Sequence, residues 1–206
     1  MSRFAAAAVA VAMLTWCCVA LPATEVNAAP ATDTLEQLMA LLSQRQHGHV
    51  SFTEIHTSSI LDRPLESSGE MFYDAPDRVE KRTLKPKPES MLLEKGQLTL
   101  ERRHKQYHVA LADYPQAIPY IEAIRATLSG DRAALEKWFR VAYSANGTHW
   151  NLKLTPLDAK VAAQVREVSI EGALDEIATV TVQLANGDRS VTSLHGMPAD
   201  HAEPAT

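Results

Sequence analysis

Residues 118–139 read IPYIEAIRATLSGDRAALEKWF, and this stretch decides the fold because it places two helices inside a long series of strand-like segments. In its first half, apolar residues recur at the spacing of one helix face: Ile118, Ile121, Ile124 and Leu128. The second half opens on Asp131, a residue type that caps helices, and carries further apolar residues: Ala134, Leu135, Trp138 and Phe139. Helices of this kind must bury their apolar faces, and a sheet face is the obvious surface. We therefore expect the pair to cover a curved sheet whose interior an apolar guest could share.

One helix and six strand-like segments precede this stretch. The helix is expected to begin at Asp33 and to end at His47-Gly48, with an apolar stripe formed by Leu35, Leu38, Met39 and Leu42. Turn residues separate the segments, which are His49–Thr57, Glu66–Tyr73, Arg78–Leu84, Ser90–Glu94, Gln97–Arg103 and Gln106–Ala112. Because the connections are so short, we expect an antiparallel meander.

Five more segments follow the helix pair: Phe139–Ser144, Thr148–Leu154, Ala163–Gly172, Glu176–Leu184 and Arg189–Leu194. Asn146-Gly147 and Asn186-Gly187 are typical of tight hairpin turns. Apolar and polar residues alternate along several strands, which gives the sheet one apolar and one polar face. Open twisted sheets rarely exceed ~10 strands without curling, so about eleven strands predict a curled sheet in a single domain.

The first residues are typical of an export signal. A short basic start is followed by an apolar core from Phe4 to Leu21, and Val26-Asn27-Ala28 fits the small-x-small rule for cleavage after Ala28 or, as an alternative, Ala29. A retained membrane anchor is the other interpretation, since ~17–25 apolar residues span a bilayer. We expect cleavage and a periplasmic protein, with a signal peptide at residues 1–28, one domain at 29–194 and a disordered tail at 195–206.

Catalytic and metal-binding patterns are missing from the sequence. Both cysteines, Cys17 and Cys18, lie inside the expected signal, so the mature chain would have no disulfide and no thiolate site. His104 and His108 would stand roughly 13 Å apart on a strand rising ~3.3 Å per residue, too far to chelate one ion. No hydrolase, zinc-protease or phosphate-loop motif occurs. We expect no enzyme, no catalytic residue, no metal and no cofactor.

Charge is distributed unevenly along the chain. The net charge of −5 argues against nucleic acid as the main partner. Residues 78–105, however, contain only four Glu but nine Lys or Arg, at positions 78, 81, 82, 85, 87, 95, 102, 103 and 105. One interpretation is a solvated outer face that blunts strand edges. The other is a surface that docks onto an acidic partner or an anionic lipid headgroup.

Five short segments in a fixed order connect this chain to a known family. They are HVSFTE (49–54), GEMFYDAP (69–76), LSGD (128–131), WNLKLTP (150–156) and LANGDRS (184–190). Together with the signal, the first helix and the helix pair, they resemble the LolA family of periplasmic outer-membrane lipoprotein carriers and its LolA-related members, across essentially the whole mature chain.

The resemblance implies a fold that is mainly β with helices: an unclosed antiparallel half-barrel of about eleven strands with an N-terminal helix and a central helical lid. It also implies a monomeric carrier that binds acyl chains of a lipoprotein or lipid without covalent chemistry. Such a carrier accepts cargo from an inner-membrane transporter and delivers it to an outer-membrane acceptor. This chain has Ala75 where LolA carriers have an arginine linked to lid closure, so a different lipid cargo is also expected.

Strand alternation and the helix stripes predict which side chains bind the cargo. The predicted ligand-binding residues are Phe52, Met71, Met91, Leu93, Leu98, Leu100, Val109, Ile121, Ile124, Leu128, Trp138, Trp150 and Leu152. A register error of one residue would invert a strand's face, and any of these residues could instead be ordinary core. The alternative function is a periplasmic sensor or interaction module that binds a membrane protein without exchangeable lipid.

Overall fold

The computed structural model describes residues 34–103, 105–113 and 118–196. The expected signal peptide at residues 1–28, the tail from residue 197 onward and His104 all lie outside the described residues. Within the described part of the chain, no helix combines the length and the apolar character needed to cross a membrane.

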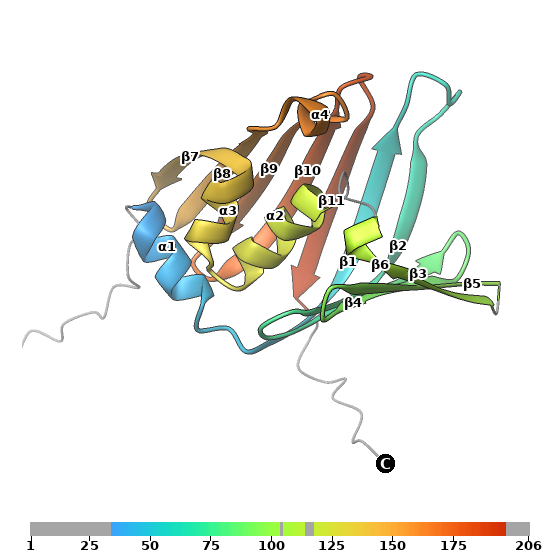
Figure 1. Ribbon diagram of the computed structural model, residues 1–206, viewed down its shortest axis with the longest axis horizontal. Coiled ribbons are helices and arrows are strands. Elements are labelled where there is room, and N and C mark those ends of the chain that lie inside the picture. The colour runs from blue at the N-terminus through green and yellow to red at the C-terminus, as the bar shows by residue number, and fades with distance from the viewer. Residues whose placement is uncertain (1–33, 104, 114–117, 197–206) are drawn as a thin grey trace, which may run out of the picture.

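One antiparallel sheet of eleven strands contains every described strand, and its two edges, β6 and β7, do not pair with each other (Figure 1). The strand order is β6-β5-β4-β3-β2-β1-β11-β10-β9-β8-β7, so the chain closes the middle of the sheet by pairing β1 with β11. The strands are β1 His47–Thr57, β2 Leu65–Asp74, β3 Arg78–Lys85, β4 Glu89–Glu94, β5 Gln97–Arg102, β6 Lys105–Ala110, β7 Phe139–Asn146, β8 His149–Pro156, β9 Val165–Ala173, β10 Glu176–Leu184 and β11 Arg189–Gly196. This confirms the predicted fold class, a mainly β, unclosed sheet with an N-terminal helix and central helices.

Several element boundaries differ from the sequence-based prediction, most of them by one or two residues. Helix α1 (Leu35–Leu42) ends earlier than predicted, because His47 and Gly48 pair with β2 and belong to β1. Residues after Asp158 form a short helix, α4 (Ala159–Ala162), where Asp158 accepts hydrogen bonds from the first backbone N–H groups, so β9 begins at Val165. At the other end of the domain, β11 continues through His195 and Gly196, which the prediction assigned to the tail.

The helix pair is formed by α2 (Ile118–Leu128) and α3 (Arg132–Trp138), and a 3₁₀ turn, η1 (Leu111–Asp113), precedes it. Asp131 caps α3 as predicted, because its Oδ1 accepts a hydrogen bond from the Ala134 N–H at 3.0 Å. Gly130 turns the chain between the two helices with φ of +65°. An added Cβ there would stand 2.1 Å from the Met39 carbonyl oxygen, so the turn lies directly against α1.

The hydrophobic core occupies only one part of the sheet. Helices α1, α2 and α3 lie over the strands from β7 to β11 and leave β3 to β6 uncovered (Figure 1). The core is formed by Leu38, Met39, Leu42, Ala123, Ala126, Leu135, Phe139, Trp150, Leu152, Leu154, Val168 and Ile170. Each large side chain buried here contributes about 1.5–3 kcal/mol. The packed helices therefore fix one wall of the space between α2 and the rest of the curved sheet.

Candidate functional site

A cavity of about 330 Å³ lies beside the core, between α2 and the inner face of the sheet. Strands β1, β2 and β3 line it through residues that share a face, as the pairings Val50↔Met71 and Tyr73↔Val79 show. Strands β9, β10 and β11 and the end of α1 form the opposite side, with further apolar side chains: Leu42, Ile170, Ile177, Val180, Val182 and Leu194. The lining is therefore mostly apolar and comes from eight strands and two helices.

Seven of the thirteen predicted residues line this cavity: Met71, Met91, Leu93, Leu98, Ile121, Ile124 and Leu128. Among the strand residues, Leu93 and Leu98 lie directly opposite each other. The three helix residues face the cavity and are partly exposed, whereas Ala123 and Ala126 of the same helix are buried in the core. One apolar face of α2 therefore serves both the core and the cavity.

The other six predicted residues do not line the cavity: Phe52, Leu100, Val109, Trp138, Trp150 and Leu152. Trp150 and Leu152 belong to the core, and Trp138 packs against it. Trp150 can lie flat over the neighbouring strand because Gly172 has no Cβ there, and its Nε1 donates to the Leu174 carbonyl at 2.8 Å. Leu100 and Val109 are partly exposed residues of the outermost strands.

Phe52 is buried on the inner face of β1 beneath a charged group. The Lys81 ammonium lies 4.7 Å from the centre of its ring. Lys81 also forms an ion pair with Glu54, Nζ to Oε2 at 2.5 Å, and the Ser190 hydroxyl donates to the other carboxylate oxygen at 2.5 Å. Glu54 and Lys81 line the cavity, with side chains about four-fifths buried.

The pKa of Glu54 reflects this setting. Burial pushes it upward, but the hydrogen bonds from Lys81, Ser190 and Ser67 and the charge of Lys81 together outweigh burial, and the pKa lies below its ordinary value. Glu54 is therefore a carboxylate at neutral pH and neutralises Lys81. The two residues are far apart in sequence, and only the register of β1, β2 and β3 brings them together.

The two other cations that line the cavity are also paired with carboxylates. Arg45, after α1, contacts Asp175 between β9 and β10, with Nη2 2.8 Å from Oδ2 and 2.7 Å from the backbone oxygen. Arg125 of α2 donates hydrogen bonds from its Nε and Nη2 to the Glu122 carboxylate, and its Nη2 lies 3.8 Å from Asp131 Oδ2. Each cation of the described lining thus has an acidic partner, and the cavity offers little net positive charge.

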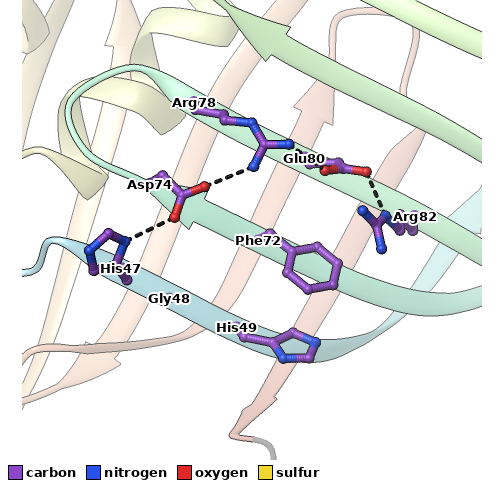
Figure 2. A pocket seen from close by; sticks show the side chains of 8 residues that line it. All are labelled: His47, Gly48, His49, Phe72, Asp74, Arg78, Glu80 and Arg82. Carbon is purple, nitrogen blue, oxygen red and sulfur yellow. Dashed lines mark hydrogen bonds and ion pairs between the residues drawn. The ribbon is translucent and has the colours of Figure 1, made fainter. Parts of the chain in front are cut away.

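A second hollow, of about 390 Å³, lies on the opposite face of the sheet (Figure 2). Its charged side chains form a continuous series of contacts from His47 through Asp74, Arg78 and Glu80 to Arg82 (Figure 2). The hydrogen bond from His47 and then that from Arg78 lower the pKa of Asp74. Although this hollow is slightly larger than the inner cavity, its lining is charged and already paired, so an apolar guest would gain less there.

Phe72 forms the floor of this outer hollow. The His49 ring stacks on it with a centroid distance of 4.2 Å, and the Arg82 guanidinium lies 4.6 Å from its centre. His47 and His49 share this outer face, as their spacing predicts, but each lies next to an acid rather than the other histidine. Among the described residues, no group of three or more His, Cys, Asp or Glu is arranged to hold a metal ion.

The basic segment divides into paired and unpaired cations. Lys81 points inward to Glu54, while Arg78, Arg82 and Arg102 pair with acids on or near their own strands. The remaining five make no ion pair with another described residue: Lys85, Lys87, Lys95, Arg103 and Lys105. All of these except Lys95 lie at one end of β3 to β6, because antiparallel pairing returns the chain to that end.

Comparison with solved structures finds several chains of low sequence identity. A LolA superfamily protein from Nitrosomonas europaea is 9% identical over 82% of this chain and 95% of its own, with a TM-score of 0.41. LprF from Mycobacterium bovis is 12% identical over 84% of this chain and 97% of its own, with a TM-score of 0.34. The MucA/MucB complex from Pseudomonas aeruginosa gives 11% identity, 81% and 59% coverage, and a TM-score of 0.41.

No curated protein matches this chain. A family model described as outer membrane lipoprotein carrier protein LolA-like, in contrast, matches residues 27–206. That match spans the whole sheet, the helix pair and the cavity between them, in agreement with the resemblance of the short sequence segments. The chain therefore belongs to the LolA-like family of outer membrane lipoprotein carrier proteins.

Proposed function

We propose that this protein is a periplasmic carrier that holds acyl chains of a lipoprotein or lipid in the inner cavity and moves them toward the outer membrane. The observation that carries the proposal is the mostly apolar cavity of about 330 Å³ beneath α2. Binding involves no covalent chemistry. Family membership adds support, because the matching family is described as outer membrane lipoprotein carrier protein LolA-like.

The size and lining of the cavity suit part of an acyl chain. Its volume is at the lower end of the ~300–1,000 Å³ of small-molecule sites. Each buried methylene gains about 0.8 kcal/mol, so about ten methylenes would gain roughly 8 kcal/mol before the cost of ordering the chain. The resulting affinity is about micromolar at best. Such an affinity permits both transport through water and release to an acceptor.

Helix α2 would act as the cover of the cavity. Its side chains Ile121, Ile124 and Leu128 are partly exposed and face the cavity, so an acyl chain would replace water against them. Arg125 of the same helix is held by acids of the helix pair rather than by the sheet. We propose that α2 can therefore move away from the sheet without leaving an unpaired charge behind.

The unpaired cations at one end of β3 to β6 would guide docking. Lys85, Lys87, Arg103 and Lys105 are free to meet an acidic partner or the anionic lipid headgroups of an acceptor membrane. Contacts between exposed charges are screened by salt over about 8–10 Å near physiological ionic strength. The docking proposal thus predicts transfer that slows as ionic strength rises.

Analysis of bound lipid tests the proposed function. The protein would be expressed with its export signal, purified from the periplasm without detergent, extracted with organic solvent and analysed by mass spectrometry. A carrier is expected to release acyl lipid and then to bind a fluorescent fatty acid that unlabelled lipid displaces. An extract without lipid, together with no binding of the fluorescent acid, would contradict the carrier and would favour an interaction module.

A further inference from the structure

Tyr73 lies at the end of β2, on the inner face of the sheet, where its side chain lines the cavity. In the sheet register it stands between Gly48 of β1 and Val79 of β3, which also line the cavity. The residue is 95% buried, with 5% of its surface exposed. Tyr73 thus places a polar group beside the apolar lining residue Val79.

The hydroxyl of Tyr73 lacks a hydrogen-bond partner. Among the described residues it is the one buried side-chain oxygen or nitrogen for which no donor or acceptor is within reach. Folded proteins pair nearly all such groups, so each exception calls for an explanation. The charged side chains of the lining, in contrast, have partners: Glu54 pairs with Lys81, Arg45 with Asp175 and Arg125 with Glu122. The hydroxyl oxygen itself has almost no exposed surface, so a ligand atom would complete the contact when α2 moves away from the sheet, as proposed above.

Tyr73 can act only as a neutral group at this position. Burial raises the pKa of its phenol, while the nearby Arg125 works in the opposite direction and Asp77 adds to the increase. The hydroxyl therefore stays protonated at neutral pH and can donate a hydrogen bond. An acceptor oxygen on the ligand is the matching chemistry.

The charge balance of the cavity favours a neutral acceptor. Arg125 is the cation whose charge acts on the pKa of Tyr73, and it already donates to Glu122 and lies close to Asp131. Lys81 and Arg45 are likewise paired. A free carboxylate would therefore lose its hydration without gaining an unpaired cation, which is costly in an apolar site. A carbonyl oxygen loses much less hydration and needs only one donor.

We propose that Tyr73 recognises the cargo by donating a hydrogen bond from its hydroxyl to a neutral carbonyl oxygen of an acyl ester or acyl amide. This inference rests on the proposed carrier function and specifies its ligand: a lipid whose acyl chain occupies the cavity and whose linking carbonyl lies at Tyr73. An N-acylated or diacylglyceryl group of a lipoprotein and a neutral lipid ester share this chemistry.

The test compares wild-type protein with Tyr73→Phe, which removes only the hydroxyl, and with Tyr107→Phe, whose exposed side chain lies outside the cavity lining. Competitors of one chain length displace a fluorescent acyl probe: a fatty acid methyl ester, an N-methyl fatty amide, the free fatty acid and the alkane. We expect Tyr73→Phe to weaken ester and amide binding about two- to tenfold, the range of one hydrogen bond, and to leave the alkane unchanged. Tyr107→Phe should match the wild type throughout.

Three results would overturn the inference while leaving the carrier function intact. They are an unchanged ester and amide affinity in Tyr73→Phe, an equal loss for the alkane, and tighter wild-type binding of the free acid than of the ester. If the wild type binds none of the four competitors, the carrier function itself fails. If the ester and the amide do bind, the ratio of their affinities distinguishes the two sources of the carbonyl.

A second measurement needs no variant. The infrared carbonyl stretch of a carbon-13-labelled ester bound to the wild type should shift to lower frequency than in hexane, as hydrogen bonding requires. An unshifted band would contradict the proposed contact.

Because the Tyr73 hydroxyl has no partner in the empty protein, Tyr73→Phe should unfold at the same denaturant concentration as the wild type or a higher one.

Discussion

Replacing Gly130 with alanine would test how closely the helix pair is fixed against α1. Gly130 has φ of +65°, and an added Cβ would stand 2.1 Å from the Met39 carbonyl oxygen and 2.7 Å from the Ser43 nitrogen. These two atoms are hydrogen-bonded to each other at the end of α1, so neither can turn aside. The alanine must therefore push the turn between α2 and α3 away from α1.

The expected loss can be worked out from two contributions. A left-handed backbone costs a residue with a Cβ about 1–2 kcal/mol. Overpacking of two fixed backbone segments adds about 1–3 kcal/mol. We therefore expect Gly130→Ala to lower the free energy of unfolding by about 2–5 kcal/mol, measured by urea unfolding with tryptophan fluorescence. The affinity for an acyl probe should fall as well, because α2 carries part of the cavity lining.

Gly147→Ala is the matched control. Gly147 has nearly the same φ, +62°, but no atom lies within 4 Å of an added Cβ in the β7–β8 hairpin. This variant should lose only the backbone contribution of about 1–2 kcal/mol. Equal losses in the two variants would refute the close contact between the helix pair and α1.

Three further predictions follow from the charged groups. Lys81→Met should lower the free energy of unfolding by about 2 kcal/mol in urea unfolding. This is less than the ~3–5 kcal/mol for breaking a fully buried pair, because Glu54 keeps its hydrogen bond from Ser190 and is partly exposed. Adding Glu54→Gln to Lys81→Met should restore most of the loss. Because the folded-state pKa of Glu54 is lowered, the stability that this residue contributes is present at neutral pH and is lost as the pH falls below about 4.5 through the folded pKa. Glu54→Gln should therefore flatten the acid side of the stability–pH curve, and an unchanged curve would exclude this role. Transfer of a fluorescent lipid to anionic acceptor vesicles should slow with added salt, and replacing Lys85, Lys87, Arg103 and Lys105 by Gln should remove the salt dependence, whereas a salt-independent wild-type rate would eliminate the docking surface.

Periodicity predicted the structure most accurately where the residues of a single element determine it. The apolar spacing of residues 118–139 predicted both helices, and Asp131 caps α3 because its N-cap role needs only its own neighbours. Leu93 and Leu98 were both predicted to line the cavity, and the hairpin between their strands places them opposite each other there. Local patterns sufficed here because pairing between adjacent segments fixed the register.

Contacts set by distant strands could not be predicted in this way. Trp150 has the alternation of a cavity residue, yet the absence of a side chain at Gly172 lets it pack into the core. Nothing local indicates that Glu54 meets Lys81, or that Tyr73 ends without a partner, since both depend on how three strands align. Val180 and Val182 were accessible to prediction, because their alternation is plain in the sequence, although the predicted cavity set omitted them.

The central claim, that the inner cavity binds acyl chains, is tested most directly by two substitutions on β1. Val50 lines the cavity, whereas Ile55 lies on the opposite face of the same strand and is 46% exposed. Val50→Asp places a carboxylate among the methylenes and should weaken binding of a fluorescent fatty acid or ester by about tenfold or more. Ile55→Asp should remain within about twofold of the wild type, as expected of a surface substitution. Equal binding by both variants and the wild type, with circular dichroism showing all three folded, would contradict the account.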